Sequence, residues 1–352
     1  MPTISPKALT DFSAALLEAV KVSPNEATRC AASLVDSNMR GYDSHGVMRI
    51  PFYVQMIEAG EIDLSSQIEI VKESPTSLVA NANWGIGQSA GFWLADKLIQ
   101  KAQQNGMAIG TMYRAGHIGR LGEYCELAAA NNLVSQVMVN THGAICRMAP
   151  PGGKSPRLGT NPIAFGVPHA ETPLILDFST SATAEGKVRV NKIAKKPCPE
   201  GWLVDCEGRP TTDPESLYAD PCGSILPFGG TQMYKGFGLG VMVDIFSGAL
   251  SGGLCSREKA ETQKGNCVFM MMINPENFGG AEHFAAEVNQ LINFIRDCPT
   301  AEGVSQIMLP GDPERLAFQR KQQEGIFLDG ENWAKLTELA TSLGVSVPDV
   351  AA

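Results

Sequence analysis

The chain has 352 residues, about twice the size of a typical single domain, so we expect two domains or one domain with a large insertion. Hydrophobic residues make up 44% of it and charged residues 18%, a globular composition that excludes a disordered protein. The net charge of −9, with no Lys/Arg run longer than Lys195-Lys196, argues against a nucleic-acid partner, which would require a cationic surface.

The first part of the chain is expected to be helical. Apolar residues at positions 9, 12, 16 and 20 follow helical spacing, and residues 1–20 lack the pattern of a secretory signal. Ser23-Pro24-Asn25-Glu26 reads as a capping box with proline at the first helical position, so it predicts a second helix, which should end at Gly41. A short segment that ends before Pro51 follows.

The next elements alternate between strands and helices. Residues 77–81 predict a weak strand, residues 90–104 a helix and residues 107–113 a second strand. From residue 117 to about 205, short apolar strands at 134–139, 163–167 and 174–178 alternate with loops rich in Gly, Pro, Asn and Thr, which are typical of binding sites.

The last third returns to helices. Residues 236–253 hold six glycines and Asp244 and are shorter than the roughly 20 apolar residues of a membrane span, so we expect a buried helix and no membrane span. A buried strand at 267–273, an amphipathic helix at 282–296 and two helices within 310–344 should follow. The nine cysteines show no metal-ligand spacing, which indicates reduced thiols, no metal site and a cytoplasmic protein.

The segment from Asp43 to Arg49 places a histidine and an arginine four residues apart. If it is helical, His45 and Arg49 lie one turn apart on one face. Reduction of a 2-oxo acid needs a proton for the carbonyl oxygen and a fixed cation for the carboxylate, and these side chains can supply both. The alternative is a helix start with Ser44 as its cap and Arg49 on a solvated face.

Other polar groups stand among glycines. The glycines of segment 116–122 would let the backbone approach a ligand beside His117. The small polar groups of segments 159–162 and 177–181 could hold pyrophosphate or ribose, and Lys235 ahead of a helix suits an anion. Ordinary turns, and a surface lysine beside glycines that permit close helix packing, are the alternatives.

Gly85-Ile86-Gly87-Gln88-Ser89-Ala90 fits the dinucleotide fingerprint G-x-G-x-x-A without its usual context. The fingerprint follows a buried apolar strand and precedes an acidic residue at the end of the next strand. Here a polar stretch, Ala80-Asn81-Ala82-Asn83-Trp84, comes before it, and the next strand ends in Tyr113-Arg114. We therefore do not expect a Rossmann site, and we interpret His142, His169 and His283 as structural.

Taken together, these segments resemble the malate/L-lactate dehydrogenase family that is unrelated to the Rossmann-type enzymes and that includes ureidoglycolate, sulfolactate and diketogulonate oxidoreductases and a piperideine-2-carboxylate reductase. The similarity covers nearly the whole chain, and residues 221–228 and 249–253 are most similar to the hydroxycarboxylate dehydrogenase B group. The segments that carry the resemblance are 43–46 with Arg49, 116–119, 151–153, 159–162, 208–214, 234–239, 273–275 and 309–311.

The resemblance implies an α+β, non-Rossmann nicotinamide-binding fold with a largely antiparallel sheet and a helical outer domain formed by both chain ends. We expect a discontinuous helical, substrate and dimerisation region at residues 1–115 and 295–352, and a cofactor-binding domain at 116–294. The implied assembly is a homodimer whose active sites draw on both subunits.

The resemblance also implies the site. His117 and His45 are acid/base candidates and Arg49 is the carboxylate clamp. The cofactor, NAD or NADP, would be lined by Thr141, Asp177, Phe178, Ser179, Lys235, Gly311, Asp312 and Pro313. The loop 141–147 departs from the usual family stretch, which leaves the role of Thr141 and the substrate side open.

The expected activity is hydride transfer between NAD(P)H and a small 2-oxo acid, such as a malate-, lactate- or hydroxyphenylpyruvate-like substrate. Reduction of a cyclic imine carboxylate such as piperideine-2-carboxylate is the first alternative, and a non-catalytic ligand-binding protein on the same fold is the second. The residues leave open the substrate, the stereochemistry, the choice between NAD and NADP, and which histidine donates the proton.

Overall fold

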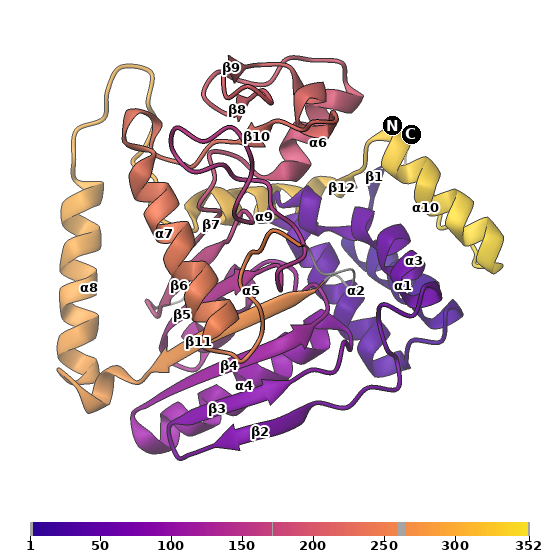
Figure 1. Ribbon diagram of the computed structural model, residues 1–352. Coiled ribbons are helices and arrows are strands. Elements are labelled where there is room, and N and C mark those ends of the chain that lie inside the picture. Colours follow the sequence, from indigo (N-terminus) through magenta and orange to yellow (C-terminus); the bar gives the residue numbers. More distant parts are fainter. Residues whose placement is uncertain (1–2, 171, 260–264, 351–352) are drawn as a thin grey trace.

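The computed structural model describes residues 3–170, 172–259 and 265–350 (Figure 1). Helix α1 (Pro6–Ala19) begins at Ser5, whose hydroxyl oxygen accepts a hydrogen bond from the backbone N–H of Ala8 at 3.2 Å. Its buried face is the one expected from the spacing, with Leu9 and Leu16 fully enclosed. The helical character of the N-terminal region is confirmed.

Helix α2 (Pro24–Met39) begins and ends where the sequence indicates, but its cap differs. The Ser23 hydroxyl donates to the Glu26 carboxylate at 2.7 Å and does not cap a backbone N–H, so the two side chains of the expected capping box bind each other instead of the backbone. The chain leaves the helix through Gly41, whose φ of 88° lies in the left-handed region that glycine adopts without strain.

The two ends of the chain build one helical core. Strand β1 (Thr3–Ile4) pairs antiparallel with β12 (Ile326–Phe327), and α10 (Gly330–Leu343) packs against α1 and α3 (Ile50–Glu58). Their apolar residues form one buried cluster that includes Leu9 and Leu336. The outer helical region expected from both chain ends is therefore confirmed, and Figure 1 shows the two ends side by side.

In the described chain, seven strands form a sheet in the order β2-β3-β4-β11-β5-β6-β7. Only the neighbours β3 and β4 run parallel, and every other pair in it is antiparallel. The expected α+β fold with a largely antiparallel sheet is thus confirmed. The strands are β2 (Glu69–Glu73), β3 (Ser77–Asn81), β4 (Met107–Ala115), β5 (Val134–Asn140), β6 (Ile163–Val167), β7 (Leu174–Phe178) and β11 (Asn266–Ile273).

Alternate side chains of the central strand β11 serve two cores. Val268 and Met270 join the core under α4 (Gly87–Asn105) and α5 (Gly122–Ala130). Phe269 points to the opposite face, where it packs with Val243 of α7 (Tyr234–Asp244). Burial on both faces explains the uninterrupted apolar run of this strand.

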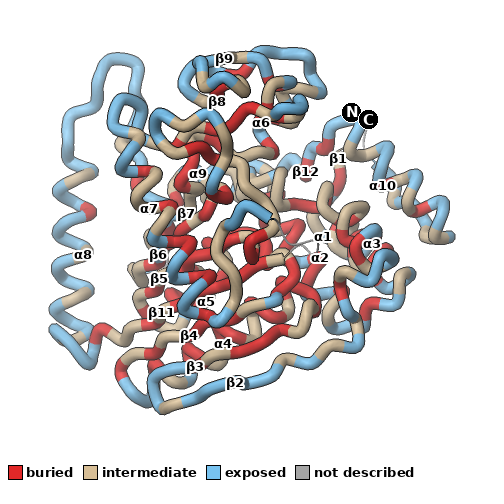
Figure 2. Tube along the Cα trace, in the orientation of Figure 1, coloured by how far each residue is buried: buried red, intermediate tan, exposed pale blue. Residues whose placement is uncertain are grey.

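Helices α7 and α8 (Ala281–Arg296) are less buried than their sequences indicate. Helix α7 continues into a π-helical turn (Ile245–Ala249), and the prediction of a buried helix here is wrong, because Met242 and Leu250 are 50% and 56% exposed. The helix covers the sheet with one side only. Helix α8 stands off the body as an exposed rod with Ile292 as its buried residue (Figures 1 and 2).

A small lobe and one more helix complete the fold. Strands β8 (Leu203–Val204), β9 (Pro210–Thr211) and β10 (Ser224–Ile225) form a small sheet beside α6 (Glu185–Ile193). Helix α9 (Asp312–Glu324) packs on α2. No helix among the described residues is both long and apolar enough to cross a bilayer. The division into two domains at residues 115/116 and 294/295 stays a prediction.

Candidate active site

The segment that carries His45 and Arg49 folds as two short 3-10 turns. Asp43–His45 and Val47–Arg49 form these turns, and Gly46 between them is extended. The single helical turn considered from the spacing is therefore replaced by a bend, in which the Arg49 Nε donates to the Ser44 carbonyl at 2.7 Å. Helix α3 then begins at Ile50 with proline in its first turn, so the segment does not end before Pro51.

The amide of Asn38, in the last turn of α2, holds this bend from behind. Its Oδ1 accepts from the Val47 N–H at 2.9 Å and its Nδ2 donates to the Asp43 carboxylate at 2.7 Å. A Cβ atom on Gly46 would overlap the same amide. The close approach explains the glycine directly after His45.

The loop that carries His117 joins β4 to α5 and packs against the segment that resembled a dinucleotide fingerprint. The Gly116 N–H donates to the Gly85 carbonyl at 3.0 Å. A Cβ on Gly87 would overlap the backbone of Gly116 and His117. Gly87 therefore serves a close backbone contact, and a Cβ on Gly85 would overlap the Ser66 side chain. These packing needs account for a G-x-G motif without a Rossmann site.

The structure brings both predicted histidines together. The rings of His45 and His117 are stacked, with centroids 5.5 Å apart and planes at 28°. Burial and the nearby Arg49 guanidinium lower the pKa of His45 to about 3, and the same two causes hold the pKa of His117 well below its ordinary value. Two neutral imidazoles and one cation thus share a largely dehydrated site.

Two buried polar residues that sequence reasoning missed position His117. The Tyr53 hydroxyl lies 2.7 Å from His117 Nδ1, and Gln88 Nε2 donates to that hydroxyl at 2.9 Å. Tyr53 and Gln88 are 4% and 1% exposed. Spacing offered a signal for Tyr53, which follows Arg49 at the same interval of four that separates Arg49 from His45.

Asp177 and its neighbours lie beside the histidine loops. The Asp177 carboxylate accepts from the Gly122 N–H at 2.7 Å, and its backbone carbonyl accepts from the Tyr42 hydroxyl at 3.2 Å. Burial raises the pKa of Asp177 to about 6. Phe178 packs edge-on against Phe228, with the ring centroids 5.6 Å apart. The Asp177 carboxylate thus supports the start of α5, while Phe178 forms part of the wall of the candidate site.

Asn266 connects the His117 loop to the Thr141 loop. Its Oδ1 accepts from the Ile118 N–H at 3.0 Å and its Nδ2 donates to the Asn140 carbonyl at 2.9 Å. The Thr141 hydroxyl donates to the Ile145 carbonyl at 3.0 Å and closes the turn of the loop that differs from the family. The sequence held no signal for Asn266, which is the first residue of a buried strand.

The remaining predicted cofactor residues stand at helix starts or in a turn. The Ser179 hydroxyl donates to the Ser181 carbonyl at 3.3 Å. Lys235 is exposed in the first turn of α7. Gly311 precedes α9 with a φ of 92° and lies against strand β7, and Asp312 and Pro313 begin that helix. Their roles toward a cofactor stay predictions.

Known proteins share this architecture over its full length. A malate/L-lactate dehydrogenase family model matches residues 4–337. Hydroxycarboxylate dehydrogenase B of Escherichia coli is 34% identical, and the match covers 96% of this chain and 93% of that protein. The sulfolactate dehydrogenase structure from Methanocaldococcus jannaschii gives a TM-score of 0.87 at 32% identity and covers 98% of both chains.

A solved imine reductase has the same fold. Delta1-piperideine-2-carboxylate reductase from Pseudomonas syringae pvar. tomato gives a TM-score of 0.83 at 31% identity, covering 97% of this chain and 100% of that one. These comparisons confirm the resemblance seen in the short motifs around His45 and His117. The chain belongs to the malate/L-lactate dehydrogenase family.

Proposed function

We propose that this protein is a 2-hydroxycarboxylate dehydrogenase that transfers a hydride between a nicotinamide cofactor and the carbonyl carbon of a small 2-oxo acid. The observation that carries the proposal is the stacked pair His45 and His117 beside Arg49 in one buried site. The names of the relatives, a hydroxycarboxylate and a sulfolactate dehydrogenase, support this substrate class.

Arg49 is the carboxylate clamp in this proposal. Its Nε is held by the Ser44 carbonyl, which fixes the plane of the guanidinium. Within the described residues no hydrogen bond occupies its two terminal nitrogens, so both are available for a bidentate bond to a carboxylate. The substrate is thereby oriented with its carbonyl near the imidazoles.

His117 is the proton donor and acceptor. Its Nδ1 is bound to Tyr53, so Nε2 is the nitrogen left for the substrate oxygen. Tyr53 accepts from Nδ1 when the ring is protonated and can donate to it when that nitrogen is bare. A bound carboxylate would offset the charge of Arg49, the second cause of the lowered pKa of His117 after burial, and would so shift that pKa back toward its ordinary value.

The residues present fit a nicotinamide cofactor. The Oδ1 of Asn161 is buried near Thr141 and has no hydrogen-bond partner among the described residues. It is therefore suited to accept a hydrogen bond from a polar group of the cofactor. When bound, the cofactor supplies the hydride. The residues proposed to hold it are Thr141, Asp177, Phe178, Ser179, Lys235, Gly311, Asp312 and Pro313.

Reduction of a cyclic imine carboxylate is the second candidate, because the imine reductase shares the fold. Arg49 would grip the same carboxylate, and a protonated C=N would take the hydride. A panel that pairs phenylpyruvate with piperideine-2-carboxylate separates the two substrates by the consumption of NADH or NADPH. Silence with every acid would favour a non-catalytic binding protein on this fold.

The histidines provide the test of mechanism. His117→Ala or His45→Ala should lower the rate of 2-oxo acid reduction by about 100-fold or more, as removal of a general acid usually does. His283→Ala, on the exposed side of α8, is the control. Wild-type turnover in both active-site variants would refute the assignment.

We also propose a homodimer in the cytoplasm. The exposed apolar residues of α7 and its π-turn, together with Phe294 of α8 at 77% exposure, are more than a monomer usually leaves in water. A second copy would cover them, and Phe294→Asp should shift the sedimentation coefficient toward a monomer. An unchanged coefficient would place the interface elsewhere.

The cytoplasmic location is supported by the cysteines. All nine are unpaired, as in a reducing compartment.

A further inference from the structure

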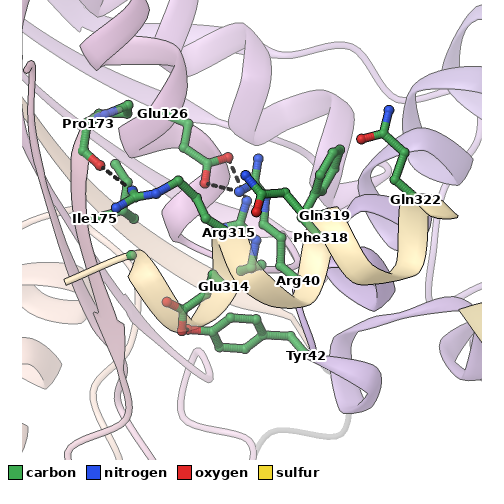
Figure 3. A pocket seen from close by; sticks show the side chains of 12 residues that line it. Arg40, Tyr42, Glu126, Pro173, Ile175, Glu314, Arg315, Phe318, Gln319 and Gln322 are labelled. Atoms are coloured by element: carbon green, nitrogen blue, oxygen red, sulfur yellow. Dashed lines mark hydrogen bonds and ion pairs between the residues drawn. The ribbon is translucent and has the colours of Figure 1, made fainter. Parts of the chain in front are cut away.

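The arginines that line the cavity between α9, the end of α2 and β7 are engaged by the protein itself (Figure 3). Arg40 forms an ion pair with Glu126 at 3.2 Å. Arg315 donates to the Pro173 carbonyl at 3.1 Å. An anion would have to displace these groups, which is costly for partly buried charges. Arg189 of helix α6, near the proposed clamp Arg49, is in the opposite condition.

Helix α6 packs directly on the bend that carries the clamp. A Cβ atom on Gly186 would lie 2.4 Å from the Ser44 Cβ, so the helix backbone touches the bend at this point. The Ser44 carbonyl is the group that accepts from the Arg49 Nε at 2.7 Å. Arg189 follows Gly186 by three positions, and it therefore lies on the face of the helix that is turned to the bend.

The guanidinium of Arg189 is packed at its base and open at its tip. Its Nε is enclosed and has no hydrogen-bond partner in the described part of the chain. The two terminal nitrogens also form no hydrogen bond there, and they stay accessible to solvent. The Glu185 carboxylate lies 4.0 Å from Nη2, which is beyond hydrogen-bond distance. The terminal donors of Arg189 are therefore available to a ligand.

The positive charges beside the clamp exceed the negative ones that act on them. Burial lowers the pKa of the Arg49 guanidinium, and the charge of Arg189 lowers it further, while Glu185 opposes both. Glu185 is also engaged elsewhere, because its Oε1 accepts from the Tyr218 hydroxyl at 2.7 Å. Two guanidiniums thus share one carboxylate, and a substrate with two negative charges would restore the balance.

A third arginine comes from the loop 141–147, which differs from the usual family stretch. The Arg147 side chain forms no hydrogen bond or ion pair with any residue that the structure describes. Burial raises the pKa of the Tyr218 hydroxyl, and the charge of Arg147 opposes that rise. The loop therefore adds positive charge on the side of the clamp where α6 and Tyr218 lie.

We infer that Arg189 is a specificity-determining residue, which binds a second acid group on the side chain of the 2-oxo acid while Arg49 holds its carboxylate. The inference rests on the proposed function and narrows its substrate class. The second group is a carboxylate or a sulfonate, since both offer a guanidinium oxygens that accept hydrogen bonds. Substrates without such a group, such as pyruvate and phenylpyruvate, gain nothing from Arg189.

Steady-state kinetics with oxaloacetate and 2-oxosuccinamate test this, because an amide replaces the second carboxylate at nearly constant size. The wild type should favour oxaloacetate by about tenfold or more in kcat/KM. Arg189→Gln should raise the KM for oxaloacetate by about tenfold with little change in kcat, since the distal group is bound equally in the ground and transition states. Arg189→Lys should restore part of the preference. Arg209→Gln, exposed on the same small lobe, is the control.

Glu185 provides a test with the opposite sign. Glu185→Gln keeps an acceptor for the Tyr218 hydroxyl and removes the charge that competes for Arg189. The KM for oxaloacetate should therefore fall, by about threefold. An unchanged or higher KM would contradict the inference, and this result does not depend on the folding of an Arg189 variant.

Calorimetry with reduced cofactor at saturation separates the inference from the proposed function, because a hydroxy acid cannot react there. Malate should bind about tenfold tighter than its 4-amide, and Arg189→Gln should remove the difference. Equal binding in the wild type, or a wild-type ratio in Arg189→Gln, overturns the inference. A malate preference that depends on Arg189, in a protein that reduces no 2-oxo acid, supports the inference while the proposed function fails. Reduction of oxaloacetate and its amide with equal kcat/KM overturns the inference alone.

Discussion

Tyr53 gives the sharpest prediction about how the site works. Tyr53→Phe removes the hydroxyl that lies 2.7 Å from His117 Nδ1 and that accepts from Gln88. Two buried polar atoms then lose their partner, at a cost of about 1–3 kcal/mol each in the free energy of unfolding. The imidazole is also free to rotate, and a displacement of about 1 Å at a reacting group lowers rates by up to about 100-fold.

We therefore expect kcat for 2-oxo acid reduction to fall by about 10- to 100-fold in Tyr53→Phe, with KM changed by less than about threefold because Arg49 is retained. Gln88→Leu should lower kcat in the same direction, and the double variant should lose less than the product of the single effects. Tyr113→Phe is a control that removes a hydroxyl outside the site. A variant that unfolds more easily but keeps the wild-type kcat would refute the positioning role.

Three further predictions concern pH and the loops. The pKa of His45 is lowered on folding, so this residue should contribute a loss of stability as the pH falls below about 6.5, of about 2 kcal/mol at about pH 5, in addition to any loss from His117. His45→Gln should flatten that loss in urea titrations at the two pH values, and an unchanged slope would contradict the burial argument. In Gly87→Ala the added methyl overlaps the His117 backbone, so kcat should fall. The fall in kcat should exceed the fall in the folded fraction, which the midpoint of thermal unfolding reports. Asp177→Ala, which leaves the Gly122 N–H unpaired, should destabilise the protein by about 1–3 kcal/mol in urea titrations, and Asp177→Asn should restore most of this.

Local signals were sufficient for most elements of the fold. Strand β7 lies at the residues that its apolar run indicates, and α2 ends before Gly41 as its glycine requires. The exposure of α7 could not be predicted from its sequence, because an apolar helix that covers a sheet with one side resembles a buried helix in composition. The pairing of β1 with β12 joins residues more than 300 positions apart, which no local pattern reports.

The sequence pointed to the residues that are proposed to react, and it did not point to the residues that only position another group. His45, His117 and Arg49 were candidates because proton transfer and carboxylate binding need those side chains. Tyr53 and Asn266 act through a hydrogen bond to a neighbouring loop, and such a contact depends on tertiary distance alone. The glycines at 85 and 87 show the reverse case, because a known motif arose there from close packing of Gly85 against Ser66 and of Gly87 against His117.

The central claim is that Arg49 binds the carboxylate of the substrate beside the two imidazoles. Calorimetric titration of oxamate, with reduced cofactor at saturation, tests it most directly. Arg49→Gln should weaken oxamate binding by about 30-fold or more, since truncation of a desolvated charge pair costs about 2–5 kcal/mol, and the exposed Arg157→Gln should bind like the wild type. Unchanged oxamate affinity in Arg49→Gln would contradict the account.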